Sequence, residues 1–164
     1  MKISEQWLRE WVNPAINSAR LAEQLTMAGL EVDTIESAAP DFSQVVVGKV
    51  TELNPHPQAD RLRVAQVDVG QAEILQIVCG APNVAKGVCV PTALIGAQLA
   101  EMKIKRSKLR GIESQGMLCS AKELGLGDNA DGLMILPENA QPGQDLHDLL
   151  ATQDTIIEVD LTPN

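Results

Sequence analysis

The chain has 164 residues, 45% of them hydrophobic, a composition that allows a packed core in one or two small domains and excludes a disordered chain. The formal net charge is −9, so the chain is not a protein that coats nucleic acid through overall electrostatic attraction. It contains two Trp, one Phe and no Tyr, so the core must be aliphatic and aromatic platforms for stacking bases are nearly absent.

The three cysteines, Cys79, Cys89 and Cys119, lie in apolar stretches and lack the short spacing of a zinc site. Their odd number does not fit a disulfide framework, so buried free thiols in a reducing cytoplasm are favoured. No stretch is long and apolar enough to predict a membrane span, and none has the pattern of a signal peptide. The sequence therefore predicts a cytoplasmic protein.

The first part of the chain predicts two short helices followed by a strand. Residues 1–13 have a helical pattern that Ser4 can cap, and the Asn-Pro pair that follows stops it. A second helix begins near Ser18, and Gly29 is well placed as its C-terminal cap. Residues 30–35 then alternate apolar and polar side chains, as a half-buried strand does.

A segment with linker chemistry, residues 37–43, separates these elements from a region of short apolar runs. The runs are residues 45–50, 62–69, 74–79, 88–94 and 133–136. Because turn signals separate them at short intervals, they favour a small barrel or sandwich over alternating βαβ units. Residues 142–150 predict a short closing helix, with His147 at the solvated surface.

Residues 156–161 alternate like a strand but have no partner of their own nearby. We therefore expect this strand to return to the N-terminal elements, which makes the barrel an insertion. The predicted organisation is the first part of a host domain at residues 1–39, a barrel domain at residues 40–151 and a return strand at residues 152–164. Since the sequence stops before the host domain is complete, we expect the chain to be a piece of a longer protein.

Two prolines flank His56 in a turn that leads directly into a strand. One interpretation makes His56 and Asp60 an acid–base pair. A rigid turn in which Asp60 accepts backbone N–H groups is favoured, because no nucleophile or metal set accompanies the pair. A hydrolase that uses His56 with Cys79 is a competing hypothesis, although Cys79 ends an apolar run, which favours a core thiol.

A dense group of cations interrupts the acidic chain, with five basic side chains in eight positions. They are Lys103, Lys105, Arg106, Lys108 and Arg110. Their local positive potential suits a phosphate backbone, and the alternative is a solvated hairpin edge that its charge protects against aggregation. A polar loop follows and places Ser114 and Met117 beside the cations, where a small donor and a flexible apolar group can contact an exposed base.

Three motifs stand out together: the turn His-Pro-x-Ala-Asp-Arg-Leu, the strand Ile-Val-Cys-Gly-Ala-Pro-Asn and the loop Lys-Leu-Arg-Gly-x-x-Ser-x-Gly-Met-Leu-Cys-Ser. They resemble a family of tRNA-binding modules with the oligonucleotide-binding (OB) fold. Such modules occur free-standing, at the end of some methionyl-tRNA synthetases and near the start of bacterial phenylalanyl-tRNA synthetase β subunits. The opening Met-Lys-Ile-Ser-Glu-x-Trp-Leu-Arg-Glu-Trp-Val, the internal Leu-Thr-Met-Ala-Gly-Leu-Glu-Val-Asp and the closing Thr-Pro-Asn look like those β subunits.

The resemblance implies an α+β fold, mainly β, in which a five-stranded OB barrel is inserted into a small N-terminal α/β element. It implies tRNA contact through Ser114 and Met117, which match the family's loop, and through the basic residues at 103–110. It also implies an α subunit as partner in an α2β2 tetramer that joins phenylalanine to its tRNA with ATP and magnesium. No membrane or DNA partner is expected.

The resemblance implies no catalytic residue, metal ligand or cofactor in this chain. In the synthetase family the synthetic site lies in the α subunit, and the editing and anticodon contacts lie later in the β subunit. Because the chain is acidic and has no basic tail, we expect it to bind tRNA weakly in isolation. Two alternatives stay open: a free-standing tRNA-binding module, whose chain should end soon after the barrel, and a structural spacer without RNA contact.

Overall fold

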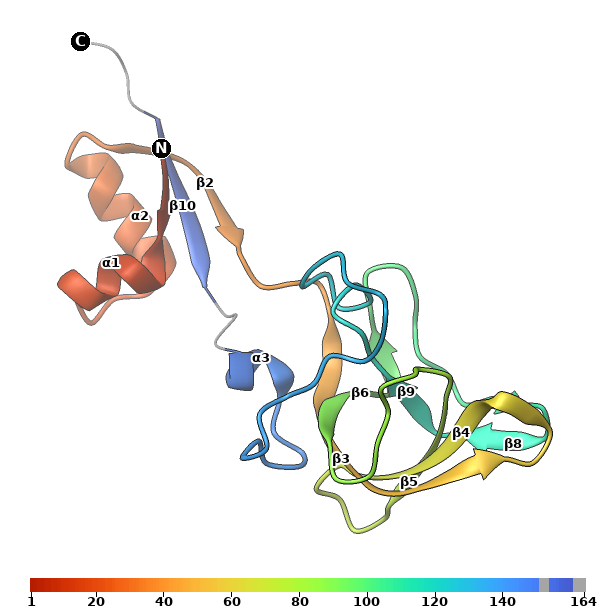
Figure 1. Ribbon diagram of the computed structural model, residues 1–164. Coiled ribbons are helices and arrows are strands. Elements are labelled where there is room, and N and C mark those ends of the chain that lie inside the picture. The colour runs from red at the N-terminus through yellow and green to blue at the C-terminus, as the bar shows by residue number, and fades with distance from the viewer. Residues whose placement is uncertain (151–153, 161–164) are drawn as a thin grey trace. The chain divides into compact units, whose positions relative to one another are not determined.

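The computed structural model describes residues 1–150 and 154–160 (Figure 1). The chain forms two compact units: a first unit of Met1–Ala39 with the described part of Ala151–Asn164, and a barrel unit of Pro40–Leu150. The predicted domain boundary at residues 151 and 152 and the closing Thr-Pro-Asn motif lie outside the described residues.

The first unit is a three-stranded antiparallel sheet with two helices. β1 (Lys2–Ser4) leads into α1 (Glu5–Trp11), and α2 (Ser18–Met27) leads into β2 (Glu31–Ser37). β10 (Thr155–Asp160) lies between the other two strands, in the order β1-β10-β2. β10 is therefore the return strand that the alternation near the end of the sequence predicts. The buried core of this unit consists of Leu21, Ile157 and Val159.

Local capping chemistry sets the ends of both helices. Ser4 Oγ accepts a hydrogen bond from the Trp7 amide at 3.0 Å, which confirms the predicted cap. Gly29 follows α2 with a φ of +94°, a left-handed conformation that favours glycine. The prediction of helix from residue 1 was wrong, because Lys2–Ser4 extend to pair with β10 before the helix begins.

The barrel unit contains a five-stranded antiparallel sheet in the order β5-β4-β3-β6-β9. Its strands are β3 (Ser43–His56), β4 (Ala59–Asp68), β5 (Leu75–Cys79), β6 (Cys89–Gln98) and β9 (Gly116–Leu118). The chain is mainly β, and the sheet forms a nearly closed barrel consistent with an OB-like fold, as the sequence predicts.

Hydrogen bonds between the two edges of this sheet nearly close the barrel. The Gln115 amide donates to Gln76 O at 2.8 Å, and the Gln76 amide donates to Gln115 Oε1 at 2.9 Å. The Val78 amide donates to Ser114 Oγ at 3.1 Å, so a side-chain oxygen accepts where a regular ladder would use a carbonyl. The segment before β9 is thereby attached along β5.

The core of the barrel unit is aliphatic, as the scarcity of aromatic residues predicts. The three cysteines are buried free thiols, which confirms the prediction from their spacing. The prediction of a strand at residues 133–136 was wrong. Leu136 forms an isolated bridge with Cys89 instead, and β9 takes the place of the fifth strand.

Two smaller features complete the barrel unit. β7 (Ser107–Leu109) and β8 (Ile112–Ser114) form a hairpin, and α3 (Leu146–Leu150) follows the barrel. The predicted exposure of His147 was wrong, because its ring stacks on Phe42 with the centroids 4.0 Å apart. Among the helices in the described residues, none is long and apolar enough to cross a membrane.

Candidate nucleic-acid interface

The predicted group of cations lies on the β7–β8 hairpin and on the residues that lead into it. We call residues 103–114 the basic hairpin. Its exposed cationic side chains are Lys103, Lys105, Arg106, Lys108 and Arg110. Ile104 is buried among them, and its amide donates to Ala97 O at 2.8 Å. The backbone is therefore anchored in the barrel while the cations face solvent.

The five cations differ in the partners they already have. Arg106 Nη1 pairs with Glu113 Oε1 at 3.1 Å, and Arg110 Nη1 donates to Gln58 O at 3.3 Å. In the part of the chain that the structure describes, the other three make no ion pair; they are Lys103, Lys105 and Lys108. These three ammonium groups are therefore available to a phosphate.

The turn between β3 and β4, residues 56–59, holds the basic hairpin in place, and we call it the His56 turn. His56 is buried, its Nδ1 accepts from the Gln58 amide at 3.0 Å, and its Nε2 lies 3.0 Å from Leu109 O. Because Nδ1 accepts a backbone N–H, this network assigns the ring proton to Nε2, which donates to Leu109 O. His56 thus joins the turn to the hairpin, and the Arg110 contact adds a second bond.

The catalytic interpretations of His56 gain no support from this geometry. Both of its ring nitrogens already bind backbone groups. His56 therefore has no free nitrogen to act as a general base, either in an acid–base pair with Asp60 or toward the Cys79 thiol. Burial raises the pKa of the Cys79 thiol, which works against a thiolate nucleophile. The described residues contain no group of three or more side chains that could hold a metal ion.

The two residues predicted to touch a base lie in different environments. Ser114 is 2% exposed, and its hydroxyl accepts from the Val78 amide and donates to Gly116 O at 3.0 Å. Met117 in β9 is half-buried and lines a pocket. Base contact by either residue stays a prediction. The Ser114 hydroxyl itself fixes the end of the basic hairpin to β5.

Two further exposed cations, Arg61 and Arg63 on β4, lie outside the set of site residues that the sequence predicts. Arg63 pairs with Pro55 of β3 on one side and with Cys79 of β5 on the other, close to the turn that contains His56. The alternation Arg-Leu-Arg directly after that turn was the available signal, because residues two apart in a strand share a face.

These features occupy the positions that OB folds use to bind oligonucleotides. Such folds bind with the face of their second and third strands and with the loops that join strands one to two and four to five. Here the His56 turn joins the first and second barrel strands, and the basic hairpin lies between the fourth and the fifth. In Figure 1 the hairpin strand β8 lies beside the ends of β3 and β4.

Comparisons with known proteins show the family to which the chain is similar. Residues 45–145 match the family model described as "Putative tRNA binding domain". The chain is 58% identical to the phenylalanine–tRNA ligase β subunit of Methylococcus capsulatus and 57% identical to that of Chromobacterium violaceum. Each alignment covers 100% of this chain and 21% of the relative, so the chain spans about a fifth of the curated relatives it matches. A MetRS-related protein from Pyrococcus horikoshii is 26% identical, with a TM-score of 0.46 over 62% of this chain and 86% of that chain.

Proposed function

We propose that this chain, which belongs to the tRNA-binding domain family, binds tRNA through the basic hairpin and the neighbouring His56 turn. One observation carries the proposal: three lysines that have no ion-pair partner among the described residues lie on a hairpin that His56 attaches to the turn between β3 and β4. A cluster of ammonium groups attracts phosphates locally, although the net charge of the whole chain is −9.

The residues of the site take different roles in this proposal. The three lysines contact phosphate groups; they are Lys103, Lys105 and Lys108. Arg106 and Arg110 keep the hairpin in shape through their protein partners and add to its positive potential. Met117 contacts a base, and the Ser114 hydroxyl fixes the hairpin to β5 beside it.

The whole protein is, in this proposal, the β subunit of a phenylalanine–tRNA ligase, because relatives with that name align with all of this chain. Such a cytoplasmic ligase attaches phenylalanine to its tRNA with ATP and magnesium and works with an α subunit in an α2β2 tetramer. We assign neither ATP nor magnesium to the described residues and no catalytic step to their side chains. This part of the enzyme contributes a weak contact with tRNA.

The proposal predicts that changing the three lysines to alanine lowers tRNA affinity and makes binding less sensitive to salt. Each lost phosphate contact reduces the slope of log affinity against log salt by roughly 0.7–0.9, so the slope should fall by about 2. A filter-binding titration of the 164-residue chain with tRNA at several salt concentrations measures both quantities.

A matched control variant removes the same charge elsewhere. Arg20, Lys49 and Lys86 are exposed and lie outside the basic hairpin and the His56 turn, so their replacement by alanine should leave tRNA binding nearly unchanged. Equal losses of tRNA affinity in the two triple variants would argue against a localised site. If the unaltered chain bound no tRNA even at low salt, the alternative of a structural spacer would be favoured.

A further inference from the structure

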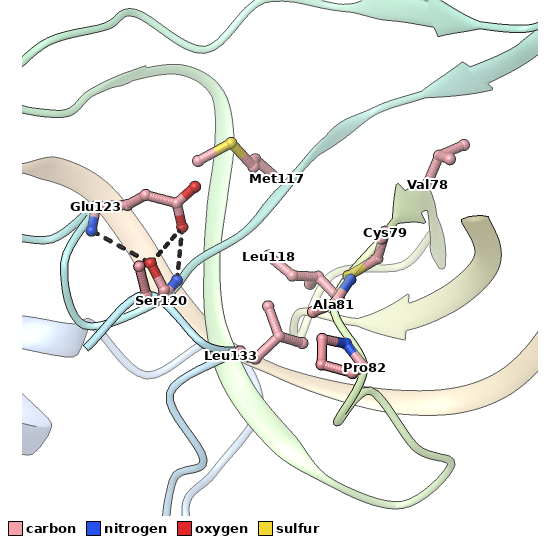
Figure 2. Close-up of a pocket in the computed structure, with 12 residues that line it drawn as sticks. Val78, Cys79, Ala81, Pro82, Met117, Leu118, Ser120, Glu123 and Leu133 are labelled. Carbon is pink, nitrogen blue, oxygen red and sulfur yellow. Dashed lines mark hydrogen bonds between the residues drawn. The ribbon is translucent and has the colours of Figure 1, made fainter. Parts of the chain in front are cut away.

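We infer that the pocket at the end of β5 binds one unstacked nucleobase that carries an exocyclic amino group, an inference that rests on the proposed function. Figure 2 shows this pocket, a cavity of about 360 Å³. Its volume falls in the range of about 300–1,000 Å³ that is typical of small-molecule sites. Proteins that recognise an RNA sequence mainly bind unstacked bases in single-stranded loops, bulges and ends.

The pocket adjoins the elements of the proposed tRNA site. Val78 lines it and donates its amide hydrogen to Ser114 Oγ, at the end of the basic hairpin. Cys79 also lines it and pairs with Arg63 of β4. A nucleotide whose base enters the pocket therefore has cations of the hairpin and of β4 close to its phosphates.

The wall formed by residues 130–133 is held in place by the protein itself. The Leu133 amide donates to Asn83 Oδ1 at 2.8 Å, and Asn83 Nδ2 donates to Leu133 O at 2.9 Å. Only glycine fits at position 132, because a Cβ there would lie 2.5 Å from Asn83 Oδ1. A wall that is already ordered loses little entropy when a ligand binds.

Five apolar residues of the lining can pack on the faces of a base. They are Ala81, Pro82, Met117, Leu118 and Leu133. Met117 is half-buried and Pro82 is exposed, so both can be reached from solvent. A flexible thioether and a rigid apolar ring can contact a base without the aromatic side chains that this chain largely lacks.

Glu123 supplies the polar group that can recognise the edge of a base. Its Oε2 accepts from the Ser120 amide at 2.7 Å and from the Ser120 hydroxyl at 2.8 Å, as Figure 2 shows. The Glu123 amide in turn donates to Ser120 Oγ at 3.3 Å, so the two residues cap this turn reciprocally. Glu123 Oε1 has no hydrogen bond within the described residues.

A carboxylate that can only accept hydrogen bonds discriminates between bases. Oε1 of this exposed residue can accept a hydrogen bond from a ligand, and the exocyclic amine of cytosine is a donor that glutamate accepts in protein–nucleic acid complexes. Uracil presents a carbonyl oxygen at the same position. Two acceptor oxygens would then face each other with no hydrogen between them, so no hydrogen bond could form. The pocket should therefore prefer cytosine to uracil, two bases of nearly equal size.

The test compares two pentanucleotide RNAs, one of five uridines and one with a central cytidine, by fluorescence anisotropy on the unaltered chain at low salt. We expect the cytidine RNA to bind about tenfold more tightly, the effect of one charge-assisted hydrogen bond. In Glu123→Gln the preference should vanish or reverse, because the amide nitrogen can donate to uracil while the amide oxygen still accepts from Ser120.

The control variant Glu138→Gln removes the same charge from an exposed residue outside the pocket and should keep the preference for cytidine. A preference that survives unchanged in Glu123→Gln would overturn the inference. So would equal affinity for the two RNAs; if the triple lysine variant then still bound RNA less well, the proposed function would stand without the base pocket. Failure to bind either pentanucleotide while tRNA still binds would overturn the inference and leave the proposed function standing, whereas failure to bind tRNA as well would overturn both.

Discussion

The Ser114 hydroxyl is a single group that connects three segments of the barrel unit. It accepts from Val78 in β5, donates to Gly116 in β9 and lies at the end of the basic hairpin. Ser114 is 2% exposed and Val78 is 8% exposed, so the Val78 amide cannot readily turn to solvent if the hydroxyl is removed. The hydroxyl therefore contributes to the stability of the barrel and to the placement of the cations.

Replacing Ser114 by alanine should lower the free energy of unfolding by about 1–3 kcal/mol, because the buried Val78 amide loses its acceptor. Ser107 pairs with Ser114 in the same hairpin but is exposed, so Ser107→Ala should change stability by less than about 0.5 kcal/mol. Urea unfolding followed by circular dichroism compares the two variants. Equal stabilities would contradict the role given to the Ser114 hydroxyl.

The Asp154 carboxylate has a comparable role in the first unit. Burial raises its pKa, but hydrogen bonds from the Ser4 hydroxyl and from the Gln6 and Thr155 amides outweigh burial and hold the pKa below 3.8. Since this pKa is lower in the folded chain than in the unfolded one, the carboxylate stabilises the fold above pH 3.8. That stabilisation is lost as the pH falls through the folded pKa.

The variant Asp154→Asn should accordingly be less stable than the unaltered chain at about pH 6, and the difference should shrink toward about pH 3. Thermal unfolding of both proteins across this interval measures the difference directly, because the other carboxyl groups titrate in both. A difference that stays constant down to the lowest pH would show that the charge of Asp154 does not stabilise the first unit.

At the scale of elements, strands with several alternating residues could be predicted from the sequence and very short ones could not. β3, β4, β5, β6 and β10 all overlap predicted runs. β9 has three residues, too few to show a period, and it is a strand only because it pairs with β6. The apolar run at 133–136 has the composition of a strand, but Leu133 and Leu136 pack into the core from an irregular segment.

The candidate site was predictable in composition and not in contacts. The sequence indicates exposed cations, and the structure bears this out for all five. The sequence contains no sign that His56 reaches Leu109, because the two residues are 53 positions apart and meet only when the barrel closes. The burial of Ser114 was hidden for the same reason, since its partner Val78 is 36 positions away.

At the scale of the whole molecule, the balance of charge limits how the chain can bind RNA. It has 13 basic and 22 acidic side chains, and five of the basic ones fall within eight positions. RNA should therefore be attracted to the basic hairpin and repelled by most of the remaining surface. This pattern favours one orientation on tRNA and a modest affinity that falls as salt rises.

Hydrogen–deuterium exchange of the unaltered chain, with and without tRNA at low salt, shows whether tRNA binds to the basic hairpin. We expect slower amide exchange in the basic hairpin, residues 103–114, and in the turn around Gln58, because bound RNA restricts the opening of both. Exchange in the first unit should not change. Protection confined to the first unit, or none in the hairpin while tRNA is bound, would contradict the assignment of the site.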